Sequence, residues 1–224
     1  ILIPSPILKL PKSIIYLAVY TEDDTPGVLT PLFKGAVELE NLKYFKVDFS
    51  SLQDVPSSDT EALAEMLSKN PAVYDTFNIA TRAVSGTLIK AFTTIKTKHL
   101  QINMKGAMYE LTPTPFDKLY PGIKSIDIFV SSFYWLKDLE MALRDVSELD
   151  WITISIDQNG IISYPDCTQL LTNLLITLKN LIMLRGVVLF VPSVFYEPLY
   201  KYLGSIKSYV TFDMKIDLQP IFDE

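Results

Sequence analysis

The segment Tyr44–Phe49 reads YFKVDF, and apolar and polar side chains alternate along most of its length. In an extended chain, Phe45 and Val47 fall on one side of the backbone. Lys46 and Asp48 fall on the opposite side. A two-residue period of this kind predicts a β-strand that buries one face and shows the other to water.

Runs of the same kind recur along the whole chain, and stretches with helical spacing of apolar residues lie between them. Eight runs can be placed, at residues 14–20, 44–49, 76–80, 99–104, 125–130, 151–156, 186–191 and 209–216. Their centres lie 23 to 35 residues apart, and the mean step of about 28 is in the range of known strand–helix repeats. Because strands joined through a crossover helix run parallel, the pattern predicts an α/β protein with a parallel sheet.

Four stretches between these runs have the clearest helical spacing, at residues 60–68, 85–93, 133–146 and 166–180. The first also carries a start signal, because Ser58 or Asp59 could cap it. Glu61 lies three residues beyond Ser58, as a capping box requires. Shorter turns are expected near residues 115–120 and 194–203.

Eight strand–helix units fit either a closed barrel or an open solenoid, and the polar face of the strands distinguishes them. A barrel strand is buried on both faces, so it should read as a nearly continuous apolar run. Here one face is polar over most of the array, at Lys46, Asp48, Asn78, Gln101, Asn103, Asp127, Thr153, Ser155, Thr211 and Asp213. Enclosing these groups would cost about 1–3 kcal/mol for each one left unsatisfied. We therefore predict one open solenoid, a horseshoe of about eight repeats over residues 1–224.

Composition narrows the classes of function. With 224 residues and 49% hydrophobic content, the chain can bury a sizeable core. A net charge of −6 argues against direct electrostatic binding of nucleic acid, which depends largely on Lys and Arg. The most apolar stretch, residues 170–191, is interrupted by polar side chains too often for a membrane span.

The single cysteine, Cys167, excludes an internal disulfide framework, so we expect a cytoplasmic or nuclear protein. The chain begins at Ile1 and has no signal-peptide pattern, which suggests a fragment of a longer protein. His99 is the only histidine, and without a second histidine or a cysteine cluster we predict neither a metal nor a cofactor. Aspartates at strand ends, such as Asp48 and Asp157, would be the catalytic groups of the alternative, a compact (β/α)8-barrel enzyme.

Aromatic residues are the best candidates for binding. Tyr16, Tyr20 and Phe129 share the phase of the polar face, and large exposed aromatic side chains are typical anchors of protein interfaces. The group at residues 133–135 could belong either to an interface or to a buried helix face. The predicted partner-binding set is Tyr16, Tyr20, Lys46, Asp48, Asn78, Gln101, Asn103, Asp127, Phe129, Thr153, Ser155 and Asp213.

The chain resembles the leucine-rich-repeat superfamily, whose hydrophobic strand signature matches Leu42-Lys43-Tyr44-Phe45-Lys46-Val47 and Leu100-Gln101-Ile102. Its irregular repeat length is similar to that of fungal F-box proteins, which present substrates to a ubiquitin ligase. The string Leu10-Pro11-Lys12-Ser13-Ile14-Ile15 resembles the opening of an F-box, but it also reads as the entry to the first repeat. The resemblance implies a concave sheet that holds a protein.

We therefore expect a non-enzymatic protein–protein interaction domain that binds its partner on the concave face of the sheet. The resemblance suggests substrate recognition for a ubiquitin ligase, and a scaffold subunit of a multi-subunit complex is the other form of this hypothesis.

Overall fold

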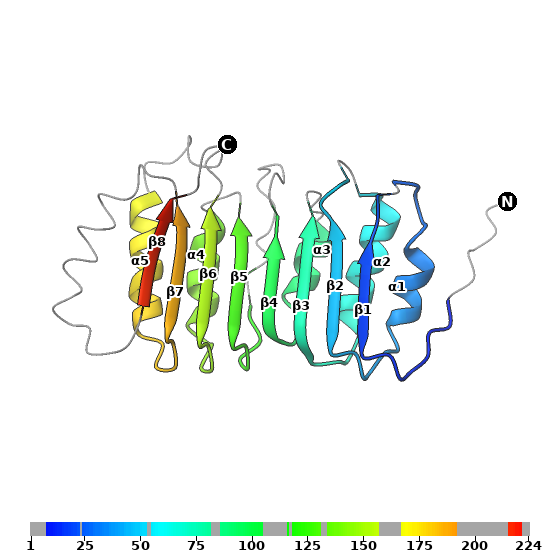
Figure 1. Cartoon of the computed structure of the whole chain (residues 1–224), viewed down its shortest axis with the longest axis horizontal. Helices are drawn as coiled ribbons and strands as arrows, with labels where there is room; N and C mark the ends of the chain where they lie inside the picture. Colours follow the sequence, from blue (N-terminus) through cyan, green and yellow to red (C-terminus); the bar gives the residue numbers. More distant parts are fainter. Residues whose placement is uncertain are drawn as a thin grey trace.

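A computed structural model describes residues 8–22, 24–52, 55–81, 86–104, 116, 118–130, 134–156, 167–191 and 215–220. These residues form an α/β structure around one parallel sheet of eight strands in the order β1 to β8. The strands are β1 (Tyr16–Tyr20), β2 (Tyr44–Phe49), β3 (Tyr74–Thr81), β4 (Thr97–Asn103), β5 (Ser125–Val130), β6 (Trp151–Ile156), β7 (Gly186–Val191) and β8 (Lys215–Pro220). Because β1 and β8 lie at opposite edges (Figure 1), the sheet is open and the closed barrel is wrong.

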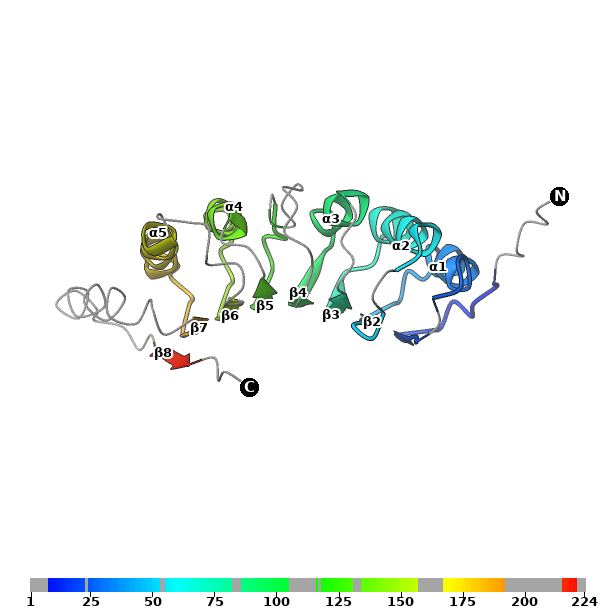
Figure 2. The same cartoon turned by 90° about the horizontal axis from the view of Figure 1, so that it is seen from above.

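Within the described ranges there are five helices, and Figure 2 shows all of them on the same face of the sheet. They are α1 (Thr30–Ala36), α2 (Ser57–Lys69), α3 (Gly86–Phe92), α4 (Tyr134–Leu143) and α5 (Cys167–Lys179). The strands follow a shallow arc with the helices on its outer side (Figure 2). We call the inner side of the sheet, on which none of the described helices lies, the free face.

The core lies between the sheet and the helices, where apolar side chains from successive strands align in register. One such row contains Val19, Val47, Ile79, Ile102, Ile128, Ile154 and Leu189, all of them buried. Aromatic rings fill the space under β2 and β3: the ring centroids of Phe45 and Phe77 are 5.7 Å apart, and those of Phe77 and Phe92 are 6.4 Å apart. The apolar phase of the strands is therefore the phase that faces the helices.

The expected strand positions are confirmed for β1 to β7 within two residues at each end. The eighth is displaced, because the structure places β8 at Lys215–Pro220 instead of residues 209–216, and residues 209–214 lie outside the described part. Apolar residues alternate from Val210 to Leu218, so the pattern alone does not show where this strand begins or ends. In the structure, Ile216 and Leu218 are in register with Val187 and Leu189 of β7.

The four expected helices are confirmed as α2 to α5 with shifted ends, but α1 was not predicted. The apolar pattern of this seven-residue helix is too short to stand out, because its buried residues are Phe33 and Ala36. Pro31 lies in its first turn. The expected turn at residues 115–120 carries no helix in its described part, and residues 194–203 lie outside it.

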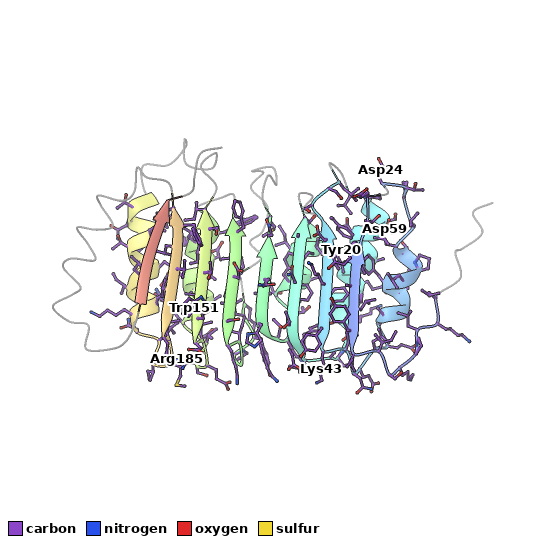
Figure 3. All side chains as sticks on the ribbon, in the orientation of Figure 1. Tyr20, Asp24, Lys43, Asp59, Trp151 and Arg185 are labelled. Atoms are coloured by element: carbon purple, nitrogen blue, oxygen red, sulfur yellow. The ribbon has the colours of Figure 1, made fainter. Side chains whose placement is uncertain are left out.

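The predicted capping box at the start of α2 is wrong. The helix begins at Ser57, its N-cap residue is Pro56, and no side chain caps it. Asp59, which is 2% exposed, accepts hydrogen bonds from the connection between β1 and α1 instead (Figure 3). Its donors are the Gly27 N–H at 3.0 Å, the Leu29 N–H at 3.1 Å and the Thr30 hydroxyl at 2.8 Å. Asp59 is therefore a hydrogen-bond acceptor for groups at the start of α1, which would otherwise lack a partner within their own helix.

Candidate functional site

The free face carries nearly the whole set of residues predicted to bind a partner. Strand register places them on three parallel rows that cross the sheet, and only Asp213 lies outside the described residues. Tyr16, Tyr20, Asn103 and Asp127 are exposed. The remaining members are half-buried between their neighbours: Lys46, Asp48, Asn78, Gln101, Phe129, Thr153 and Ser155. A role in binding stays a prediction for each of them.

The central row is a ladder of polar side chains. Lys46, Asn78, Gln101, Asp127 and Thr153 follow one another in register from β2 to β6. The Asn78 side-chain amide donates to Oε1 of Gln101 at 2.6 Å, and the Gln101 amide donates to Oδ2 of Asp127 at 3.5 Å. Because each strand contributes one polar group at the same height, the ladder joins three strands across the free face.

A shallow groove of about 340 Å³ runs over this ladder. Its lining combines side-chain amides, two carboxylates, one lysine and one aromatic ring with small side chains. The lining residues are Lys46, Asp48, Asn78, Ala80, Gln101, Ile102, Asn103, Asp127, Phe129 and Ser155. Since these groups can both donate and accept hydrogen bonds, the groove suits a polar extended ligand.

Two of the charged groups in the groove already have local partners. The Lys46 ammonium lies 5.0 Å from the centroid of the Tyr20 ring, and its interaction with Tyr20 raises the pKa of Lys46. Asp48 accepts hydrogen bonds from Ser50, at 2.6 Å from the hydroxyl and 3.0 Å from the N–H. These bonds lower the pKa of the Asp48 carboxyl.

Within the described part of the chain, Asp127 lacks a strong local partner of the kind that Lys46 and Asp48 have. Desolvation by surrounding side chains raises the pKa of its carboxyl, even though the residue as a whole is exposed. The long hydrogen bond from Gln101 works in the opposite direction and is outweighed. The carboxylate in the middle of the groove is therefore partly desolvated, and its hydrogen bond from Gln101 is weak.

Aromatic side chains flank the groove on two sides. On β1 and β2, the rings of Tyr16 and Tyr44 are 6.3 Å apart, and Tyr16 is 59% exposed. On β6, the Trp151 indole donates to the Thr153 hydroxyl at 3.2 Å and covers Gly186 of the next strand. A Cβ atom at position 186 would lie 2.1 Å from that indole, so glycine leaves the space the ring occupies. Figure 3 shows Tyr20 and Trp151 over different parts of the sheet.

Tyr44 and Trp151 were missing from the predicted set although both belong to the free face. They are 43% and 42% exposed, and each is the first residue of its strand. The signal was present, because Tyr44 has the same phase as Lys46, and Trp151 the same phase as Thr153.

Charged residues just before the strands or at their second position form a rim along the lower edge in Figure 3, where Lys43 and Arg185 are labelled. Lys98 pairs with Asp75 at 2.7 Å, and Arg185 pairs with Asp150. These pairs lower the pKa values of both aspartates. These two ion pairs connect neighbouring strands, and the rim contains both acidic and basic residues.

Among the other residues considered from the sequence, His99 and Trp135 can be placed with their contacts. His99 is exposed, and its Nδ1 lies 2.7 Å from the Ser125 hydroxyl. Trp135 is 8% exposed and its ring packs edge-on against Phe116 at 6.4 Å, so the buried alternative holds for it. Phe133 and Asp157 lie outside the described residues, and Cys167 is the first residue of α5. In the described ranges, no three His, Cys, Asp or Glu residues are grouped so that they could hold a metal ion.

Among the helices that the structure describes, none has the length and apolar character needed to cross a membrane. No protein-family model matches the chain, and no curated protein matches its sequence. A function must therefore be inferred from the chemistry of the residues that the structure describes.

Proposed function

We propose that this protein is a non-enzymatic interaction module that holds a partner protein against the free face. The observation that supports this function is a sheet face that no described helix covers and that bears polar and aromatic side chains, while the helices pack on the opposite face. Eight strands span seven gaps of about 4.8 Å, and five residues of strand span about 17 Å, which gives a surface of about 34 by 17 Å. This is of the order of one side of a standard protein interface, about 800 Å².

The spacing of the carboxylates favours binding over catalysis. Asp48 stands on β2 and Asp127 on β5, three strand gaps apart and two residues apart along the strands, so their backbones are separated by about 16 Å. Paired carboxylates that perform acid–base hydrolysis of glycosides lie about 5 to 9.5 Å apart. Carboxylates this far apart on an open sheet are better suited to contacting separate groups of a partner than to a shared catalytic step.

We further propose that the sheet is the concave side of a solenoid of the leucine-rich-repeat type. The similar strand–helix units, the sequential strand order and the arc of the strands in Figure 2 support this assignment. In that setting the module would be the substrate-recognition part of a ubiquitin ligase or a scaffold subunit, in the cytoplasm or nucleus.

The test compares two variants with the same change in net charge. The free-face variant carries Asp48→Arg, Asn103→Arg, Asp127→Arg and Thr153→Arg. The helix-face control carries Glu61→Arg, Thr87→Arg, Asp145→Arg and Asn173→Arg, all at exposed positions away from the sheet. Circular dichroism should show that both variants fold, because every replaced side chain is at the surface or half-buried.

Co-purification from cells should then yield proteins that the wild type and the helix-face variant both capture and the free-face variant loses. Equal capture by all three proteins, or selective loss with the helix-face variant, would place the interface elsewhere and overturn the proposed function.

A further inference from the structure

We infer that the groove on the free face binds an extended basic segment of the partner and that Asp127 receives a lysine or arginine side chain from it. This inference rests on the proposed function and names the partner's chemistry. The binding mode is an extended peptide crossing the strands from β2 to β6 over the ladder of polar side chains.

The first support is the state of Asp127. Among the residues that the structure describes, no lysine or arginine lies within ion-pair distance of this carboxylate. Its hydrogen bond from Gln101, at 3.5 Å, is at the limit for such a bond. A carboxylate that is partly desolvated and poorly paired gains most from a cationic donor, because charge-assisted hydrogen bonds are the strong ones.

The second support is that the neighbouring charged groups cannot supply this cation. The ammonium of Lys46 is directed toward Tyr20 of β1, and Lys46 stands three strands from Asp127. Asp48 is satisfied by Ser50. With two carboxylates and one lysine, the groove is acidic overall, so charge complementarity favours a basic ligand.

The third support is the match between the groove and a peptide backbone. From β2 to β6 there are four strand gaps, about 19 Å, which an extended peptide covers in about six residues at 3.3 Å each. Asn78 and Gln101 each carry an amide that can donate to a carbonyl and accept from an N–H. These groups can pair with a backbone whatever its sequence, which leaves Asp127 to select for charge.

The experiment uses three pools of fluorescein-labelled nine-residue peptides that differ only in a fixed central residue. That residue is arginine, its neutral isostere citrulline, or glutamate, and the other eight positions are randomised. Fluorescence polarisation with the whole protein should show about tenfold tighter binding of the arginine pool than of the citrulline pool, the difference expected for one charge-assisted hydrogen bond.

Asp127→Asn should abolish the difference between the arginine and citrulline pools, and Asp127→Arg should shift the preference to glutamate. The matched control is Glu61→Gln, which removes an exposed carboxylate from the helix side of the protein and should keep the arginine preference. Equal binding of the three pools, no binding by any of them, or an arginine preference that survives Asp127→Asn would overturn the inference.

The two proposals fail in different ways. If the free-face variant loses its cellular partners while the peptide pools show no preference, the proposed function stands and the basic peptide is rejected. If partner capture depends on the helix-face residues instead, the proposed function fails, whatever the peptides do.

Discussion

At the residue scale, Glu140 shows how one buried acid joins two helices. It lies on α4, is 7% exposed and accepts hydrogen bonds from the Thr177 hydroxyl of α5 at 2.6 Å and from Arg144 at 2.8 Å. Burial alone would raise the pKa of this carboxyl, but the bonds from Thr177 and Arg144 outweigh it and leave the pKa below its usual value.

A carboxyl whose pKa is lower in the folded than in the unfolded protein stabilises the fold above its unfolded pKa, about 4.3 for glutamate. That contribution is lost as the pH falls through the folded-state pKa. We therefore expect Glu140→Gln to lower the free energy of unfolding by about 1–3 kcal/mol at pH 7. The deficit should shrink as the pH falls below about 4, because the wild type loses its own contribution there.

Urea denaturation of the wild type and of Glu140→Gln, at pH 7 and at a pH below about 4, would measure this effect. Glu148→Gln, at an exposed position in the loop after α4, is the control and should change little. A deficit that is independent of pH would contradict the assignment of an ionised Glu140.

At the scale of secondary structure, α1 depends on residues that α2 brings to it. Seven residues are too few for a helix to be stable alone. Asp59, in the first turn of α2, binds the N-terminal side of α1. Asn70, just after α2, donates to the carbonyls of Ala36 at 2.9 Å and Val37 at 3.2 Å. The two helices are therefore joined at both ends.

Asp59→Ala and Asn70→Ala should each lower the free energy of unfolding by about 1–3 kcal/mol, because each leaves partly buried backbone groups at one end of α1 without their side-chain partner. Hydrogen exchange should accelerate in α1 and leave α4 and α5 unchanged. Asn173→Ala, on the exposed side of α5, should affect neither measurement. Uniform acceleration across all helices would contradict a local role for these two residues.

These contacts explain which helices the sequence could reveal. The longer helices α2 and α5 carry enough apolar periodicity to be predicted from their own residues. The stability of α1 comes from side chains about 30 positions away, which a local pattern does not contain. For the same reason Asp59 was interpreted as a cap of its own helix, since its sequence position fits both roles.

At the scale of the whole molecule, the polar phase of the strands was sufficient to predict an open sheet. Lys46, Gln101 and Thr153 do stand on the face away from the helices, where each is half-buried and contacts a neighbouring polar or aromatic side chain. The side-chain geometry that singles out Asp127 was beyond the sequence. It depends on the long hydrogen bond from Gln101 to Asp127 and on the position of the Lys46 ammonium near Tyr20. Neither contact follows from the periodicity of the sequence.

Small-angle X-ray scattering provides a test at this scale. Eight strands in sequential order give a slab about 34 Å wide at the sheet alone, so we expect an asymmetric pair-distance distribution with a long tail. A symmetric distribution, as given by a compact sphere, would contradict the open sheet in solution.

The sequential strand order has a consequence for how such a chain can change over evolution. Each strand pairs only with its neighbours in the sequence, so no strand is inserted between two others. A duplicated or deleted strand–helix unit would widen or narrow the array and leave the remaining pairings intact. Selection could therefore adjust the number of units to the length of the ligand without redesigning the core.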